Sequence, residues 1–216
     1  MGAGDAVSPG LSMLVLCYVL GGLLLTLLTL YITLELHYFL RMCLCVLLAR
    51  FCKRKINILD DTFVHGICIT TDVDTLLYHM NNARYLRELD FARVDFYERT
   101  GLYRKIRQKG GAVVQGACTI RYRRFVRPFS IFKITSKVIY WDTKSVFMEH
   151  RFITPKDDFV RAIVLCQQRV IQCNAEDVMA ELLGVEAGVH KPTLPLEVAK
   201  WIESNEISSA NLRNGC

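Results

Sequence analysis

The sequence predicts an α+β domain in which one long helix packs on an antiparallel sheet, preceded by an N-terminal membrane-anchor helix. Two observations support this fold class. The periodic segments follow the order strand, long helix, then about four strands joined by short turns, which favours a helix packed on an antiparallel sheet. The chain also begins with an uncharged apolar run of the length that crosses a membrane.

The apolar run extends from Leu11 to Leu34 and contains no charged residue. As a helix it is roughly 36 Å long, which is enough to cross the hydrocarbon core of a bilayer. A cleaved signal peptide normally begins with a basic region, but residues 1–10 contain neither Lys nor Arg. We therefore expect a retained anchor, and the alternative is a secreted protein with a cleaved leader.

A second apolar segment, residues 35–48, is shorter and is interrupted by charged residues. We expect it to lie in the membrane interface, so that residues 11–48 contact the membrane, and a re-entrant hairpin is the alternative. A basic cluster follows, formed by Arg50, Lys53, Arg54 and Lys55. By the positive-inside rule, this cluster predicts a single-pass protein of the endoplasmic reticulum or another endomembrane, with its main domain in the cytosol.

Composition divides the chain into an anchor with a basic segment (1–55), a domain (56–175) and a helical C-terminal extension (176–216). A length of 216 residues suits one domain with additional end segments. The formal charge of +6 is modest, and no arginine-rich tract or zinc-finger spacing is present. We therefore expect no nucleic-acid partner and no metal or redox cofactor.

The 9 cysteines include no CxxC pair and no zinc-type spacing, which agrees with a reducing, cytosolic setting. Several lie in strand-like runs, where a thiol behaves as a small buried hydrophobic group. Three lie beside the predicted membrane segment and are either palmitoylation sites or ordinary apolar cysteines. These are Cys43, Cys45 and Cys52.

Residues 82–99 have the periodicity of a helix, with Leu89 and Phe96 among the apolar residues that share one face. Gly101 follows and is expected to end the helix. Residues 62–70 resemble a short strand that precedes it.

The strand pattern continues after Gly110. In residues 131–140, alternation places Phe132, Ile134, Val138 and Tyr140 on one side of a strand. Polar turns at 143–144 and 155–158 divide this region into an antiparallel meander of long strands. Two helices are expected in the C-terminal extension, over residues 175–183 and 196–213.

Polar residues gather immediately before the long helix. Asp72, Asp74, His79, Asn81 and Asn82 lie in the stretch "DVDTLLYHMNN". Aspartates and asparagines at this position are typical of a turn that caps a helix and interacts favourably with its dipole. A carboxylate and an imidazole close together are also typical of general acid–base catalysis. Both interpretations remain open at this stage, and they overlap.

The stretch "DVDTLLYHMNNARYLRELDFAR" resembles the helix-entry segment of hotdog acyl thioesterases. In the 4-hydroxybenzoyl-CoA thioesterase-like group, an Asp-x-Asp pair precedes a turn and a helix with Asn, Tyr and Glu. Plant acyl-ACP thioesterases have a similar His-x-Asn-Asn-x-x-Tyr helix start. The resemblance covers residues 58–213 and implies the hotdog fold, in which a long helix is wrapped by an antiparallel sheet.

The resemblance also implies a homodimer or tetramer with the site between subunits, where helix-start N–H groups face the thioester carbonyl. It makes Asp74 and His79 the candidate catalytic residues. The candidate substrate-binding residues are Tyr78, Asn81, Asn82 and Arg124. The expected function is hydrolysis of a fatty acyl-CoA in lipid metabolism. The alternative is a non-catalytic module that binds acyl-CoA or lipid and affects membrane lipid homeostasis.

The sequence departs from both thioesterase patterns. Leu76, Leu77 and Tyr78 replace the glycine of the benzoyl-CoA type. His79 lies one residue further from Asp74 than in the acyl-ACP type, and the intervening Asn is missing. These departures motivate the binding-module alternative.

Arg124 lies in the basic segment "RYRRFVRP". Guanidinium groups suit phosphate, so the segment is a candidate site for the phosphates of CoA. The alternatives are a solvated strand end or contact with anionic lipid headgroups.

Overall fold

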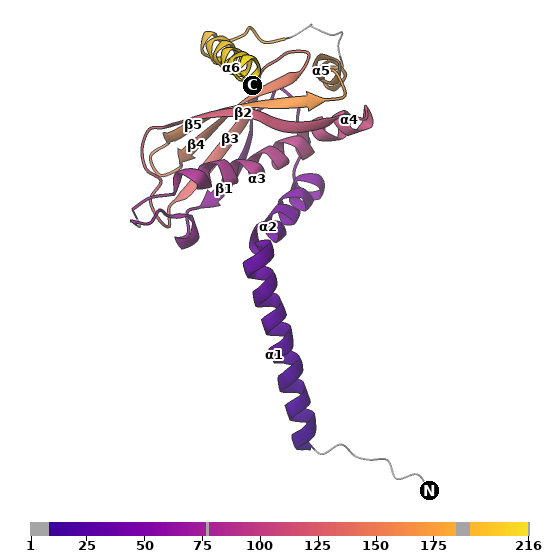
Figure 1. The fold of residues 1–216 in the computed structure, drawn as a ribbon, viewed down its shortest axis with the longest axis vertical. Helices are drawn as coiled ribbons and strands as arrows, with labels where there is room; N and C mark the ends of the chain where they lie inside the picture. The colour runs from indigo at the N-terminus through magenta and orange to yellow at the C-terminus, as the bar shows by residue number, and fades with distance from the viewer. Residues whose placement is uncertain (1–8, 77, 185–190, 216) are drawn as a thin grey trace. The chain divides into compact units, whose positions relative to one another are not determined.

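The computed structural model describes residues 9–76, 78–184 and 191–215 (Figure 1). The predicted position of Leu77 in the turn therefore lies outside the described residues. Two compact units are present, residues 1–45 and residues 46–216. The domain boundary predicted at residue 55 stays a prediction.

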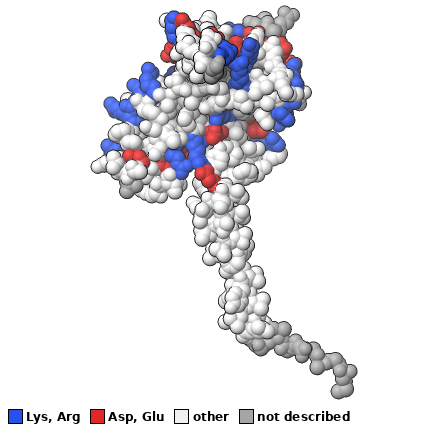
Figure 2. Space-filling model, in the orientation of Figure 1, with Lys and Arg blue, Asp and Glu red and all other residues white. Residues whose placement is uncertain are grey.

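The N-terminal unit contains α1, Pro9–Leu34, whose surface is uncharged (Figure 2). Residues Gly10–Leu34 are long and apolar enough to cross a membrane. The hydroxyl groups of Thr26, Thr29 and Thr33 each donate to a backbone carbonyl four residues earlier. Such local bonds satisfy polar groups inside a helix, so these threonines are compatible with a lipid environment.

A second helix, α2, spans Leu36–Leu47, close to the predicted interfacial helix. Glu35 separates it from α1 and has φ 47°. A single turn with π-type hydrogen bonds, Leu48–Cys52, follows α2. The location of α2 in a membrane interface stays a prediction.

The domain contains one five-stranded antiparallel sheet with the order β1-β3-β4-β5-β2. The strands are β1 Thr62–Ile67, β2 Ala112–Tyr122, β3 Ile131–Trp141, β4 Ser145–Thr154 and β5 Phe159–Ile171. The predicted turns at 143–144 and 155–158 connect β3 to β4 and β4 to β5. The order leaves β2 at one edge of the sheet and β1 at the other.

The long helix α3, Asn82–Thr100, lies along one face of the sheet (Figure 1). Tyr85, Leu89 and Ala92 pack there against strand residues in one apolar cluster, and Phe96 belongs to a second. Gly101 ends the helix with φ 78°, a left-handed conformation that glycine adopts without a steric penalty. The expected hotdog arrangement, a helix wrapped by an antiparallel sheet, is confirmed.

The predicted position of Tyr140 is wrong. A β-bulge between Val138 and Tyr140 shifts the register, so that Trp141 joins the core and Tyr140 packs against Phe147. A bulge inserts one extra residue and reverses the faces of the residues after it. Phe147 in turn contacts Trp201 of the C-terminal helix α6, Leu196–Asn214, on the face of the sheet opposite α3 (Figure 1).

Three further helices lie in the described part of the domain. The helices α5, Ala175–Leu183, and α6, Leu196–Asn214, correspond to the predicted C-terminal helices. The short helix α4, Leu102–Gln108, was not predicted, because Gly101 was interpreted only as the end of α3. A 3₁₀ turn, Thr70–Asp72, follows β1 where the predicted strand continued to Thr70.

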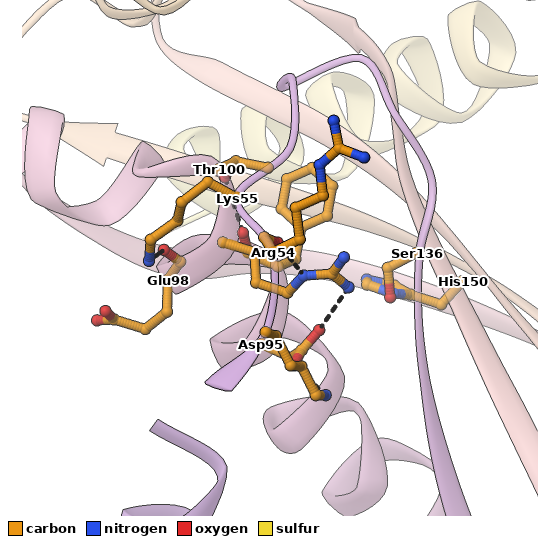
Figure 3. A network of polar contacts seen from close by, with 10 residues as sticks. Arg54, Lys55, Asp95, Glu98, Thr100, Ser136 and His150 are labelled. Carbon is orange, nitrogen blue, oxygen red and sulfur yellow. Dashed lines mark hydrogen bonds and ion pairs between the residues drawn. The ribbon is translucent and has the colours of Figure 1, made fainter. Parts of the chain in front are cut away.

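The basic segment, residues 50–55, is fastened to the C-terminal part of α3 (Figure 3). Arg50 donates to Glu98 at 3.0 Å, and Lys55 donates to the Glu98 carbonyl at 2.7 Å. Lys53 forms an ion pair with Asp95, whose side chain is fully buried. Cations near the C-terminal end of a helix also interact favourably with its dipole. The basic segment is therefore part of the domain structure and not a free linker.

His150 of β4 is buried on the α3 side of the sheet, with Nδ1 2.8 Å from Ser136 Oγ (Figure 3). Burial, together with the positive charge of Arg93, lowers the pKa of His150 to about 3 from 6.5. Below pH 6.5 the unfolded chain therefore binds a proton that the folded chain does not. The stabilising contribution is complete above pH 6.5 and is lost as the pH falls toward 3.

We expect the free energy of unfolding to fall by up to about 1.4 kcal/mol per pH unit in this window because of His150 alone. Urea unfolding of the full chain in detergent, measured between about pH 7 and pH 5, checks this. The variant His150→Gln should show a shallower pH dependence, whereas His65→Gln on the exposed side of β1 should match the unmodified chain. Equal slopes for all three proteins would contradict the assignment.

Candidate functional site

A closed turn leads from β1 into α3. Val73 and Met80 form an isolated antiparallel bridge, and the Asp74 N–H donates to the His79 carbonyl at 2.9 Å. The Met80 N–H donates to the carbonyl of Val126, in the segment between β2 and β3, at 2.9 Å. These bonds close the turn at the start of α3 and fix its base to the segment between β2 and β3.

Asp72 has a structural role in this turn. Its carboxylate accepts from the Ile69 N–H at 3.0 Å and lies 3.3 Å from the Arg84 guanidinium. Its backbone carbonyl accepts from Asn81 N–H at 2.7 Å. Because Asp72 is buried and its oxygens are occupied, the turn-forming interpretation of this residue is supported.

Asn81 is the N-cap of α3, as the residue types before the helix predicted. Its Oδ1 accepts from Ala83 N–H at 2.9 Å, and its carbonyl accepts from Arg84 N–H at 2.9 Å. The next backbone N–H, that of Asn82, has no hydrogen-bond partner in the described part of the chain. An open N–H at a helix N-terminus is a donor for a carbonyl oxygen or an anion.

Asp74 and His79 face each other across the loop. Asp74 Oδ2 lies 3.9 Å from His79 Nε2, and Oδ1 accepts from the Tyr78 N–H at 3.0 Å. Partial burial acts to raise the pKa of Asp74, but the backbone N–H groups of Tyr78 and His79 and the nearby imidazole outweigh it, so the net shift is downward. Asp74 is therefore a carboxylate at neutral pH.

The ring of His79 has a defined orientation. Its Nδ1 lies 2.9 Å from the Met80 carbonyl, which can only accept, so Nδ1 carries the proton. The ring stacks on Phe125 with 4.2 Å between centroids. The other ring nitrogen, Nε2, therefore faces the Asp74 carboxylate. A separation of 3.9 Å exceeds a direct hydrogen bond, which makes the gap suitable for a bridging water or substrate atom.

Apolar side chains beside this pair are open to solvent. Leu76, Tyr78 and Phe125 are 69%, 70% and 65% exposed. Such a group next to half-buried polar residues is typical of a surface that another molecule covers.

Arg124 immediately precedes Phe125, the residue that stacks on His79. Its guanidinium carbon lies 4.3 Å from the centroid of the Phe159 ring, and its N–H donates to the Arg161 carbonyl at 3.2 Å. Arg124 thus follows β2 and lies beside the first residues of β5.

Other parts of the described structure offer fewer groups suited to catalysis or ligand binding. A depression of about 430 Å³, lined by Arg54, Lys55, Ile56, Asn57 and Asp60, lies at the opposite, C-terminal end of α3. Within residues 9–76, 78–184 and 191–215, no group of His, Cys, Asp or Glu is arranged to hold a metal ion.

Sequence reasoning missed two neighbours of the site. Phe125 supports His79, and Tyr122 Oη donates to the Asn82 carbonyl at 3.0 Å. Both come from the end of β2 and the segment after it, which are distant from the turn in sequence. In the sequence they are visible only as aromatic residues among the arginines of "RYRRFVRP", and that pattern does not indicate contact with α3.

A family model described as the thioesterase-like superfamily matches residues 68–202, which is more than half of the chain. The chain belongs to the thioesterase-like superfamily. The matched residues include the turn, α3 and strands β2 to β5. The superfamily assignment confirms the resemblance seen in the helix-entry stretch.

Relatives of this thioesterase-like chain match it over most of its length. A Drosophila melanogaster protein named THEM6 is 43% identical over 190 residues, which are 88% of this chain and 97% of that protein. A Xenopus laevis protein of the same name is 39% identical over 180 residues, 83% of this chain and 86% of that protein.

Solved structures share the hotdog fold of this superfamily member. The probable thioesterase YbaW from Escherichia coli has a TM-score of 0.52 at 24% identity, covering 56% of this chain and 95% of that one. The hypothetical protein TT1821 from Thermus thermophilus has a TM-score of 0.50 at 16% identity, covering 59% and 98%. At these identities the likeness shows the fold alone.

Proposed function

We propose that this protein hydrolyses an acyl thioester, with fatty acyl-CoA as the substrate class. One observation carries the proposal: the Asp74 carboxylate faces the His79 imidazole in the turn that leads into α3, whose first N–H, that of Asn82, has no partner among the described residues. A base, a proton carrier and an oxyanion donor are the groups that acyl transfer to water requires. Membership of the thioesterase-like superfamily supports this reaction class.

In the proposed reaction, the substrate carbonyl oxygen lies against the Asn82 N–H. Asp74 accepts a proton from water, and the water oxygen adds to the carbonyl carbon. The oxyanion that forms is stabilised by the helix-start N–H. The carbon–sulfur bond then breaks, and the thiolate receives the proton by way of His79, giving a carboxylic acid and a free thiol.

We further propose that the active form is a homodimer or a pair of dimers. The strand β2 lies at an edge of the sheet and is 11 residues long. A long edge strand with open backbone groups is suited to pairing with a second copy. A partner would also cover the exposed Leu76, Tyr78 and Phe125 and complete an apolar channel. Light scattering on the purified chain in detergent tests this, and an active monomer would contradict it.

The proposed setting is an endomembrane, with α1 as the anchor and the domain in the cytosol. The apolar length of α1 and the basic segment after α2 support it. A fatty acyl chain partitions into bilayers, so an anchored enzyme meets its substrate there. Protease protection of a C-terminal tag in microsomes tests the orientation: a protected tag would overturn it, and a mature protein lacking α1 would favour secretion.

The deciding experiment uses the full chain in detergent or nanodiscs. Acyl-CoAs of increasing chain length are supplied, and free thiol release is followed. We expect release that saturates with substrate and varies with chain length. Saturable acyl-CoA binding without release would instead establish the non-catalytic binding module, which the bulky Tyr78 in place of a turn glycine motivates.

A further inference from the structure

Three guanidinium groups surround one phenylalanine ring at the turn between β4 and β5. The guanidinium carbons of Arg123, Arg124 and Arg161 lie 4.8, 4.3 and 5.1 Å from the centroid of Phe159. Lys and Arg side chains gather along this flank of the domain, on the left of Figure 2. Contact with an aromatic ring orients a guanidinium group. Arg161 also donates to Thr154 and Asp157, and Arg123 donates to the Val160 carbonyl at 3.4 Å. The guanidinium of Arg124 has no hydrogen-bond partner among the described residues.

The cluster is short of negative charge. Arg161 forms an ion pair with Asp157. Arg123 and Arg124 have no carboxylate partner among the residues that the structure describes. Like charges within about 10 Å of each other repel, and an anion placed between them removes the repulsion. The arrangement therefore prepares a site for a ligand with more than one negative charge, which a phosphate group provides.

The cluster is joined to the candidate active site by a short segment of backbone. The N–H groups of Arg123 and Arg124 both donate to the Arg161 carbonyl, at 2.7 and 3.2 Å. The next residue, Phe125, stacks on His79, and Val126 accepts from the Met80 N–H. Consecutive residues 123–126 therefore connect the cluster to His79 and to the base of the turn.

We infer that the Arg123–Arg124–Arg161 cluster on Phe159 binds a phosphate group of the carrier to which the acyl chain is attached. The inference deepens the proposed function, on which it rests, by assigning a soluble phosphorylated thiol carrier such as CoA. Arginine forks bind phosphate by two parallel hydrogen bonds, and stacking orients them in advance. An anionic lipid headgroup offers the same chemistry, and the test separates the two sources.

The test compares the full chain with two double variants of equal charge. Arg123→Gln/Arg124→Gln removes the unpaired members of the cluster. Arg121→Gln/Arg127→Gln removes two arginines of the segment "RYRRFVRP" that do not contact Phe159. Each protein is assayed with acyl-CoA, with acyl-3′-dephospho-CoA and with acyl-pantetheine, which lacks phosphate. Binding of CoA and pantetheine is measured separately by calorimetry, and binding to vesicles that contain phosphatidylserine is measured with the same proteins.

We expect the cluster variant to raise KM for acyl-CoA by about 10-fold or more with little change in kcat, since charge-assisted hydrogen bonds are lost. Its KM for acyl-pantetheine should not change, and the control variant should match the unmodified chain for all substrates. The cluster variant should also bind CoA more weakly than the control variant does. This measurement requires no hydrolysis, so it tests the inference even if the proposed reaction does not occur.

Two outcomes would overturn the inference. An equal rise in KM for acyl-CoA in both double variants would show that the overall positive charge of the segment acts on the substrate, and not a specific site on Phe159. Loss of vesicle binding in the cluster variant, with unchanged CoA binding and KM, would assign the cluster to lipid headgroups. In both cases thiol release by the unmodified chain would continue, and the proposed hydrolysis would stand.

Discussion

Replacement of Asp74 by asparagine is expected to lower kcat for acyl-CoA hydrolysis by about 100-fold or more, because general bases contribute about 10²–10⁴-fold. Asparagine keeps an oxygen that can accept from the Tyr78 N–H, so the loop should remain folded. The asparagine amide cannot accept the proton of the attacking water. Steady-state kinetics of thiol release on the full chain, with calorimetric binding of CoA as a second readout, measures this effect.

The adjacent aspartate provides the matched control. Asp72 is buried and holds the turn, so Asp72→Asn should lower the unfolding midpoint, with a smaller effect on kcat in the protein that remains folded. The opposite result, full activity in Asp74→Asn and a loss of kcat in Asp72→Asn, would show that Asp72 and not Asp74 is the general base. A fully active Asp74→Asn would remove the catalytic proposal for this residue.

Replacement of Lys53 by methionine is expected to lower the free energy of unfolding of the domain by about 2 kcal/mol. The reason is that Asp95 has a fully buried side chain and pairs with Lys53 and Arg99. Removal of one partner from a buried pair costs about 3–5 kcal/mol, and the partial exposure of Lys53 and the remaining Arg99 reduce this figure. Urea unfolding of the full chain in detergent measures the change.

Lys55→Met serves as the control for this prediction. The Lys55 ammonium donates only to a backbone carbonyl, at an exposed position, so its loss should cost less than about 0.5 kcal/mol. Equal destabilisation by the two variants would mean that the buried Asp95 carboxylate is not what Lys53 stabilises. The double variant Lys53→Met/Asp95→Leu should recover part of the loss, because no buried carboxylate remains and Arg99 still donates to the Arg54 carbonyl.

Local patterns predicted those elements whose side chains repeat on one face. The helix α3 was found because Leu89 and Phe96 share its buried face, and Gly101 ends it as expected. The bulge before Tyr140 could not be found in this way, because alternation on both sides of it looks regular. The burial of Asp95 could not be predicted either. A carboxylate on a helix is expected to be exposed unless its cationic partner, here the sequence-distant Lys53, is known.

The candidate site was predictable to the extent that it is local in sequence. Asp74, His79 and Asn81 lie within one turn, so their proximity and the cap on α3 followed from the stretch itself. The stacking of Phe125 on His79 and the assembly of arginines on Phe159 depend on how β2 and β5 pair. Pairing of strands brings together residues that no short pattern connects.

In the proposed membrane-anchored form, the side chains of residues 50–55 have two successive roles. During synthesis, cations that follow a hydrophobic helix are read as an orientation signal before the later domain exists. Once α3 has formed, Lys53 forms an ion pair with Asp95, and Arg50 forms one with Glu98. A substitution here would thus act first on biogenesis and later on the lifetime of the finished protein, so variation at these positions is constrained twice.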